Sequence, residues 1–328
     1  MSFKKFNLLK DIYYNNKYIS LYLQEGEELF DFRYDEGEIF LVNRTIKRPI
    51  IKIGNINIGD GYYDLESAYG YGGFYTNSND DDFLKRAFEV YEKRCYDEKI
   101  IAEFMRFHPF NDFPIEHKNH LAFNLYDRDV VVVSLENDIL SAYTSKVRNT
   151  IKRASEKVVV HESDNLEKFI ALYTETMTKN EATEFYFFDE TLFKNLYGMK
   201  EVKLYEVLFE KEVVAMGFFM EGSDLMHYHL SANSQLSYTL NANYTLLYKL
   251  SEIAKAEGKS YFVLGGGSTA LADDPLLKFK KKFSKETKPF YISGKIYNQE
   301  IYNKYVRLWE EQSKENMKYF LKYRLELV

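Results

Sequence analysis

The order of hydrophobic patterns after residue 140 is the feature that most constrains the fold of this chain. A helix that begins at Ser145 precedes a short strand and two further helices. Three strands joined by tight turns then form a meander, at residues 203–209, 213–220 and 225–231. A helix to about Ala256 and a strand at residues 260–264 follow. This order predicts a mixed α/β sheet, in which antiparallel strands lead through a helix into one parallel crossover.

The first 140 residues predict a second set of similar elements. Their strands are expected at residues 39–43, 50–53, 55–58, 100–107 and 130–135. A helix starts at Asp80–Asp82 and carries an apolar stripe made by Phe83, Leu84, Ala87, Phe88 and Tyr91. The last expected element is a long helix from Asn298 to Arg324. We therefore expect two α/β lobes, residues 1–140 and 141–297, and a C-terminal helix within residues 298–328 that packs back on the first lobe.

Composition places the chain among globular proteins. Of its 328 residues, 45% are hydrophobic and 29% are charged. The single cysteine, Cys95, excludes an internal disulfide framework, is typical of a reducing compartment, and is expected to pack rather than act as a nucleophile. The longest apolar runs, residues 130–133 and 213–220, are far shorter than the ~20 residues of a spanning helix, and lysines interrupt the first ten residues. We expect a cytoplasmic protein with no transmembrane segment, either free or peripheral at the inner membrane face.

Two segments are strongly basic in a chain whose net charge is −6. Residues 278–288 contain six lysines and one glutamate, and residues 145–157 contain five basic residues and one glutamate. An acidic body with two basic islands can attract an anionic substrate to one place. Solvated helix faces are the alternative. The chain shows no RNA-recognition aromatic signature, and no DNA partner is expected.

Lys280 carries the best local signal for chemistry. Phe279 and Phe283 are four residues apart, so they lie on one face of a predicted helix and pin this turn while the lysines project elsewhere. A fixed ammonium group can stabilise the oxyanion of a tetrahedral intermediate or hold a phosphate. A solvated run of lysines is the alternative.

A run of three glycines, residues 265–267, directly follows the predicted strand at residues 260–264. Gly265 and Gly266 would let the backbone approach a ligand closely. The spacing fits neither a Walker loop nor a dinucleotide fingerprint. A simple turn is therefore the alternative to a binding loop.

The third strand of the meander contains His227 and His229, which alternation places on one face, with Tyr228 on the other. The strand end could polarise a carbonyl group, and the start of the next helix, capped by Asn241 or Asn243, could bind an anion. We expect the two histidines to be exposed strand residues. No third ligand stands at a recognisable spacing, so no metal site is expected.

Four stretches together resemble the Fem-type aminoacyltransferases, the Fem-like branch of the GNAT transferases. They lie in the expected order within residues 60–295. The stretches are residues 69–73, which read Tyr-Gly-Tyr-Gly-Gly, residues 106–110, residues 145–154, and Gly265-Gly266 with Phe279-Lys280 and Phe283. The resemblance implies two tandem GNAT-like lobes with a C-terminal helix that packs back.

The resemblance also implies a reaction, in which the amine of a peptidoglycan precursor attacks the ester of an aminoacyl-tRNA. By position, the lysine beside the reacting centre is Lys280, to which we assign an electrostatic role, and no residue is a clear candidate for a general base. The motifs and the resemblance together give a set of expected substrate-binding residues: Tyr69, Tyr71, Gly72, Arg106, Arg148, Lys152, Tyr228, Asn241, Asn243, Gly265, Gly266 and Phe279.

Two departures from the family pattern leave the donor open. Residues 165–204 have room only for ordinary helices, where Fem proteins that grip tRNA carry a long helical arm, and residues 236–243 lack the usual coenzyme-A loop. We therefore expect a transferase that moves an aminoacyl or acyl group from aminoacyl-tRNA or acyl-CoA to an amine of a cell-envelope precursor, with no permanently bound cofactor. The alternatives are an acyl-CoA-dependent N-acyltransferase acting on an amino sugar or small amine, and a non-catalytic Fem-like protein that binds an anionic partner.

Overall fold

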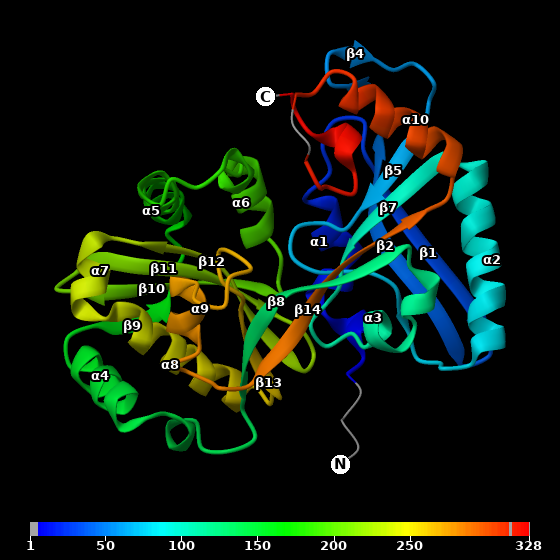
Figure 1. The fold of residues 1–328 in the computed structure, drawn as a ribbon. Helices are drawn as coiled ribbons and strands as arrows, with labels where there is room; N and C mark the ends of the chain where they lie inside the picture. Colours follow the sequence, from blue (N-terminus) through cyan, green and yellow to red (C-terminus); the bar gives the residue numbers. More distant parts are fainter. Residues whose placement is uncertain (1–5, 315–316, 328) are drawn as a thin grey trace. The chain divides into compact units, whose positions relative to one another are not determined.

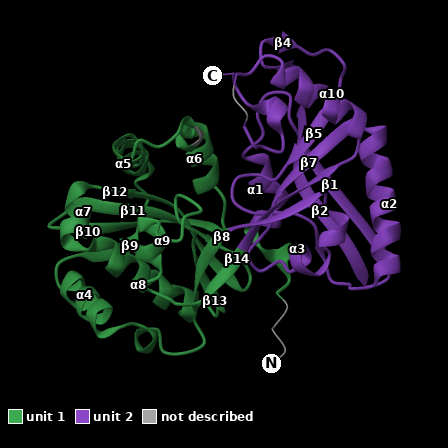
Figure 2. Ribbon diagram, viewed as in Figure 1, with its two compact units in different colours: residues 1–12, 128–289 green, residues 13–127, 290–328 purple. Residues whose placement is uncertain are grey.

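The computed structural model describes residues 6–314 and 317–327 and divides into two compact units, which Figure 2 colours separately. Unit 1 comprises the chain up to residue 12 together with residues 128–289, and unit 2 comprises residues 13–127 and the chain from residue 290 onward. The chain therefore passes between the units after residues 12, 127 and 289. The boundaries expected from the sequence, after residues 140 and 297, differ from these three positions.

The sheet of unit 1 combines a meander with one parallel crossover. Its strands are β8 (Phe123–Ser134), β9 (Val159–Glu162), β10 (Val202–Phe209), β11 (Glu212–Glu221), β12 (Leu225–Asn233) and β13 (Tyr261–Gly265). The strands β9 to β12 pair antiparallel in sequence order, β12 pairs parallel with β13, and β13 pairs antiparallel with β8. The predicted meander and parallel crossover are confirmed.

Helices cover both faces of this sheet (Figure 1). They are α4 (Ser145–Ser155), α5 (Leu166–Lys179), α6 (Glu190–Tyr197), α7 (Gln235–Leu240), α8 (Ala242–Ala256) and α9 (Pro275–Lys280). On one face, Val147 and Ile151 of α4 and Leu250 of α8 share a core with Phe219. On the other face, Phe169 of α5 contacts the ring of Phe218, with ring centroids 4.6 Å apart. Neighbouring residues of β11 thus face opposite layers, as the period of a strand requires.

Unit 2 repeats the same strand plan. Its elements are β1 (Glu28–Glu36), β2 (Ile39–Pro49), β5 (Tyr63–Glu66), β6 (Tyr75–Thr76), β7 (Ile100–Arg106), β14 (Thr287–Ile296), the separate hairpin β3 (Lys52–Ile53) and β4 (Ile56–Asn57), and the helices α1 (Asn16–Ser20), α2 (Asp81–Asp97), α3 (Phe113–Glu116) and α10 (Gln299–Glu310). The strands β1, β2 and β5 pair antiparallel, β5 pairs parallel with β7, and β7 pairs antiparallel with β14. The predicted second set of α/β elements is confirmed.

Helix α2 forms where the sequence predicts it. The side chain of Asp80 accepts hydrogen bonds from the backbone N–H groups of Asp82 (2.9 Å) and Phe83 (3.1 Å), which satisfies donors that the first turn leaves unpaired. The apolar stripe listed above is buried against β1, β2 and β7, and Cys95 lies in the same core. Burial raises the pKa of the Cys95 thiol, so this group packs as a small apolar side chain.

The last strand of each sheet comes from a segment that follows the parallel crossover of the other unit along the chain. Strand β8 follows β7 along the chain but pairs with β13, and β14 follows β13 but pairs with β7. The pairing residues of β8 and β13 belong to unit 1, and those of β14 and β7 belong to unit 2. This exchange explains why neither unit is one continuous stretch of sequence.

The C-terminal segment differs from the single long helix predicted to Arg324. Helix α10 ends at Glu310, and residues Lys322–Arg324 form a separate turn of 3-10 helix. Tyr305 and Trp309 pack among Ile53 and Ile101 of unit 2, and the indole of Trp309 donates a 2.8 Å hydrogen bond to the carbonyl of Leu325. Within the part of the chain that is described, no helix combines the length and the apolar character that a membrane crossing requires.

Candidate functional site

Three charged side chains of unit 1 surround the glycine run that follows β13. The Lys280 amine donates a hydrogen bond to the carbonyl of Gly266 (2.8 Å), and Arg128 of β8 donates to the carbonyl of Gly267 (2.9 Å). The Asp274 carboxylate accepts from the backbone N–H of Thr269 (3.0 Å). We call Arg128, residues 265–267, Asp274 and Lys280 the glycine-loop site.

The absence of side chains at residues 265–267 makes room for these three charged groups. A Cβ atom on Gly265 would lie 3.1 Å from the Lys280 amine, and one on Gly266 would lie 2.9 Å from the Arg128 side chain. On Gly267 it would lie 2.5 Å from a carboxylate oxygen of Asp274. Gly265 also has φ of +85°, a conformation that favours glycine. The glycines thus let the protein's own charged side chains approach the backbone.

The Lys280 side chain is buried, with 8% of its surface exposed. Burial lowers the pKa of Lys280 to about 8, the Asp274 carboxylate acts in the opposite direction, and Arg128 lowers the pKa further. An amine with this pKa is mostly protonated at neutral pH, yet it has lost most of its water. Such an ammonium interacts with a developing negative charge more strongly than a solvated lysine does.

The aromatic rings around α9 form the pinned turn that the sequence predicts. The rings of Phe279 and Phe283 are 5.4 Å apart, and each lies 5.4 Å from the ring of Tyr244 at the start of α8. The lysine over these rings is Lys282, whose amine donates to the Tyr244 hydroxyl (2.9 Å), while Lys280 points to the glycine loop. The aromatic cluster therefore fixes α9, and the glycine loop receives the buried amine.

The first turn of α8 differs from the predicted anion site in its capping. Asn241 adopts the left-handed conformation, with φ of 56°, and joins α7 to α8 without a capping hydrogen bond from its side chain. The amide of Asn243 donates instead to the side-chain oxygen of Asn233 at the end of β12 (2.7 Å). Asn241 is therefore the N-cap residue of α8, as predicted, although its side chain makes no capping hydrogen bond. Asparagine suits this junction because it tolerates the left-handed conformation.

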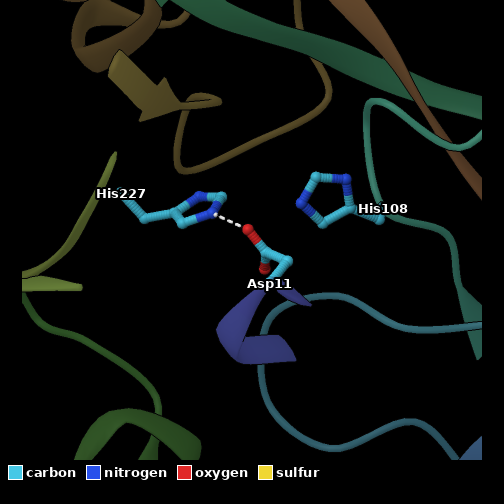
Figure 3. A group of neighbouring side chains, drawn as sticks. All are labelled: Asp11, His108 and His227. Carbon is cyan, nitrogen blue, oxygen red and sulfur yellow. Dashed lines mark hydrogen bonds and ion pairs between the residues drawn. The ribbon is translucent and has the colours of Figure 1, made fainter. Parts of the chain in front are cut away.

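The predicted exposure of the β12 histidines is wrong. His227 is 1% exposed, and its Nε2 atom lies 2.8 Å from Oδ2 of Asp11, which is 4% exposed (Figure 3). The N-terminal residues of unit 1 cover this strand face, which no local pattern could indicate. His108, also drawn in Figure 3, belongs to unit 2.

A β-bulge breaks the predicted alternation in β12. Phe218 pairs with Leu230 and Phe219 pairs with Tyr228, so His229 is the extra residue between them. Burial, with a smaller contribution from His227, lowers the pKa of His229 to about 3, so this imidazole is neutral at pH 7. Tyr228 stacks on Phe219, with centroids 5.2 Å apart, and burial raises its pKa to about 12.

The basic candidates on α4 lie on its exposed side. Arg148 donates to the carbonyls of Tyr143 (2.5 Å) and Leu140 (3.4 Å) and to the hydroxyl of Ser145 (3.2 Å), so it braces the turn that precedes the helix. Lys152 is exposed on the next turn of α4.

The candidates in unit 2 lie together around one loop. The backbone N–H of Gly72 donates to the carbonyl of Arg106 (2.7 Å), and Tyr71 packs edge-on against Tyr13, with centroids 4.9 Å apart. Tyr69 stacks on Tyr22 at 5.8 Å. The guanidinium of Arg106 binds the Glu66 carboxylate (2.5 Å) and the carbonyl of Ser67 (3.1 Å). The loop at residues 69–73 is thus anchored at its backbone, and Arg106 belongs to an internal ion network.

Two residues of the glycine-loop site were missed by the sequence reasoning. Asp274 precedes Pro275, and this pair is a recognisable start signal for a helix, since Asp274 also accepts from the backbone N–H of Leu277 (2.9 Å). Arg128 carries no comparable signal, because its partner Gly267 lies 139 positions away in the sequence.

Comparison with known proteins finds similarity at the level of structure. No protein-family model matches the chain, and no curated protein matches its sequence. FemX aligns with a TM-score of 0.70 at 13% identity, over 92% of this chain and 95% of FemX. The C-terminal domain assigned to a lysylphosphatidylglycerol synthetase of Agrobacterium fabrum aligns with a TM-score of 0.54 at 11% identity, over 83% of this chain and 84% of that domain. L-PGS from Bacillus licheniformis gives 0.53 at 13% identity, over 81% and 83%.

These alignments extend over most of both chains in each comparison. They agree with the repeated strand plan of the two units, in which a parallel crossover follows an antiparallel meander. The resemblance drawn from the four sequence stretches is therefore confirmed for the fold. This chain has the tandem GNAT-like α/β fold of FemX.

Proposed function

We propose that this protein is a transferase that moves an aminoacyl or acyl group from an activated donor to an amine. The observation that carries the proposal is the buried Lys280 amine, held 2.8 Å from the carbonyl of Gly266 beside Arg128. The fold shared with FemX, and with a domain assigned to a synthetase of an aminoacylated lipid, supports the same class of reaction.

In the proposed reaction, the acceptor nitrogen attacks the carbonyl carbon of the donor, which is an ester or a thioester. A C–N bond forms, the carbonyl oxygen gains negative charge in the tetrahedral intermediate, and collapse breaks the bond to the leaving oxygen or sulfur. The proton lost by the nitrogen is taken up by the leaving group or by solvent. Lys280 stabilises the oxyanion in this scheme, because a desolvated ammonium lowers the energy of charge that develops beside it.

The acceptor that we propose is an amine of a cell-envelope precursor, reached in the cytoplasm or at the inner face of the membrane. The donor is aminoacyl-tRNA or acyl-CoA. The first alternative is another transferase, an acyl-CoA-dependent N-acyltransferase that acts on an amino sugar or small amine. The second alternative is a non-catalytic protein that binds an anionic partner. The experiment below separates all three.

The test is mass spectrometry of acceptors incubated with the protein and one donor at a time. The acceptors are a peptidoglycan precursor with a free amine and glucosamine, and the donors are pooled aminoacyl-tRNA and acetyl-CoA. We expect one pairing to give a product heavier by the transferred group. Lys280→Met should lower this rate by about 100-fold or more, as the loss of one oxyanion donor does elsewhere.

Lys278→Met is the matched control, since Lys278 is an exposed lysine of the same helix, α9. It should keep the wild-type rate. Full activity of Lys280→Met would remove the proposed role of this residue. No product with any pairing, together with measurable binding of the donor, would instead identify the protein as a non-catalytic one.

A further inference from the structure

The Asp274 carboxylate is the anionic centre of the glycine-loop site. It is 3% exposed. It accepts hydrogen bonds from the backbone N–H of Leu277 (2.9 Å), the backbone N–H of Thr269 (3.0 Å) and the hydroxyl of Thr269 (3.1 Å). The first bond caps α9, which ends at Lys280, and the other two hold the glycine loop. The Asp274 side chain thus joins α9, which carries Lys280, to the glycine loop, which accepts the hydrogen bond of the Lys280 amine.

These hydrogen bonds keep Asp274 ionised. Burial alone would raise the pKa of Asp274, but the bonds from Leu277 and Thr269 lower it overall. A buried carboxylate that stays charged stabilises a nearby cation more than a solvated one does. The charged groups that face Lys280 are Asp274, at the start of α9, and Arg128, on β8, and they act on its charge in opposite directions.

Resting on the proposed function, we propose that Asp274 is a positioning residue of the transfer reaction: its carboxylate ties the glycine loop to α9 and holds the Lys280 amine in the cationic form. The acidic group does not touch the substrate in this account. It acts through Lys280, whose ammonium form is the one that can stabilise an oxyanion.

The proposal makes the titration of Lys280 depend on a residue six positions earlier. The measurement is competitive labelling with acetic anhydride at pH 6 to 10, with peptide mass spectrometry to follow acetylation of Lys280 alone. Only the neutral amine reacts, so the labelling rate reports the fraction that has lost its proton. We expect a wild-type midpoint near pH 8. In Asp274→Asn the midpoint should fall by roughly one pH unit, because the substitution removes the negative charge that raises the pKa of Lys280.

Three further variants separate the charge of Asp274 from its structural role. Asp274→Glu retains the negative charge and should stay closer to the wild-type midpoint than Asp274→Asn. Thr269→Val removes one hydrogen bond to the carboxylate without changing any charge, so it should loosen the loop but leave the midpoint in place. Asp273→Asn makes the same change at an exposed neighbour and should leave the midpoint unchanged.

The labelling experiment needs no donor or acceptor, so it is independent of whether transfer occurs. Equal midpoints for the wild type, Asp274→Asn and Asp273→Asn would refute the role of Asp274, even if transfer is found. Where transfer is found, Asp274→Asn should move the alkaline limb of its pH–rate profile to lower pH, and Thr269→Val should not. A labelling shift without any transfer would leave the electrostatic link between Asp274 and Lys280 standing, but it would overturn the proposed function and with it the role of Asp274 in transfer.

Discussion

Replacing Gly267 with alanine should destabilise unit 1 through one identified contact. A Cβ atom at this position would lie 2.5 Å from Oδ1, 2.6 Å from Cγ and 3.0 Å from Cβ of Asp274. The backbone of Gly267 is not in the left-handed region, so alanine is allowed there by conformation. The predicted cost therefore comes from the collision with the carboxylate and from the hydrogen bonds that its displacement weakens.

The magnitude follows from three contributions. Inserting a methyl group into a packed site costs about 1–3 kcal/mol. Weakening the bond from Asp274 to the first turn of α9 costs up to about 1 kcal/mol, the value of a helix cap. Glycine-to-alanine substitution by itself stabilises the folded state by about 0.4–1 kcal/mol, because it lowers the conformational entropy of the unfolded chain. We expect Gly267→Ala to lower the free energy of unfolding of unit 1 by about 1–3 kcal/mol.

The assay is urea unfolding followed by far-UV circular dichroism. The single tryptophan, Trp309, belongs to unit 2, so its fluorescence does not report on the unit that contains Gly267. Gly198→Ala is the matched control within unit 1, since the added Cβ would lie 3.4 Å from its nearest atom, an ordinary contact, and the φ of Gly198 is −72°. That control should be neutral or slightly stabilising.

A double-mutant cycle tests the cause. In an Asp274→Ala background, the two closest atoms are gone, while the 3.0 Å contact to Cβ remains. The effect of Gly267→Ala should therefore fall below about 1 kcal/mol in that background. If Gly267→Ala costs the same with and without the carboxylate, then the glycine is needed for another reason and the packing argument is refuted.

Two further predictions concern unit 2 and can be followed by Trp309 fluorescence during urea unfolding. Burial raises the pKa of Glu103, and the hydrogen bonds from Tyr297, Asn43 and Tyr91 offset part of this rise. Since the unfolded carboxyl loses its proton first, the free energy of unfolding of the wild type should fall as the pH rises from 4.5 toward the folded pKa, and Glu103→Gln should remove this fall. Arg324→Met should lower the free energy of unfolding by about 3 kcal/mol, because Arg324 donates two hydrogen bonds, of 2.8 and 3.0 Å, to the fully buried Asp64.

Each of these two predictions has a surface control. Glu89→Gln changes an exposed carboxylate of α2 and should keep the wild-type pH dependence. Arg33→Met breaks an ion pair with Asp35, in which both side chains are more than 40% exposed, and should cost less than about 1 kcal/mol. A pH slope that survives in Glu103→Gln would exclude Glu103 as its origin. An Arg324 effect no larger than that of Arg33 would show that the buried network contributes little.

Local pattern predicted the elements that have a single apolar face. Helix α2 begins after Asp80 and buries the predicted stripe, and α4 begins at Ser145 as expected. The strands β10 to β12 differ from their predicted bounds by one or two residues. These elements could be predicted because apolar residues that recur with a period of 3.6 or 2 residues indicate which side of a helix or strand is buried.

Elements without a clear apolar periodicity were missed, or their length was predicted wrongly. Strand β14 (Thr287–Ile296) has intermediate exposure along most of its length, so hydrophobicity does not mark it. The single helix predicted from Asn298 to Arg324 was too long, because α10 ends at Glu310. In the structure, the Phe320 ring packs on Phe123 from a segment outside α10. Apolar side chains from different segments can share one core without sharing one helix.

Local sequence patterns were enough to predict many of the helices and strands and the mixed α/β class, and they singled out the turn around Lys280 as a candidate site. Only the tertiary structure decided that β8 and β14 are exchanged, that Asp11 meets His227, and that Arg128 and Asp274 join Lys280 around the glycines. The physical reason is the range of the interactions. Periodicity, caps and turns act between residues a few positions apart. The pairs β8–β13 and β14–β7 and the contacts of Asp11 and Arg128 instead join residues more than a hundred positions apart and leave no periodic trace in either segment.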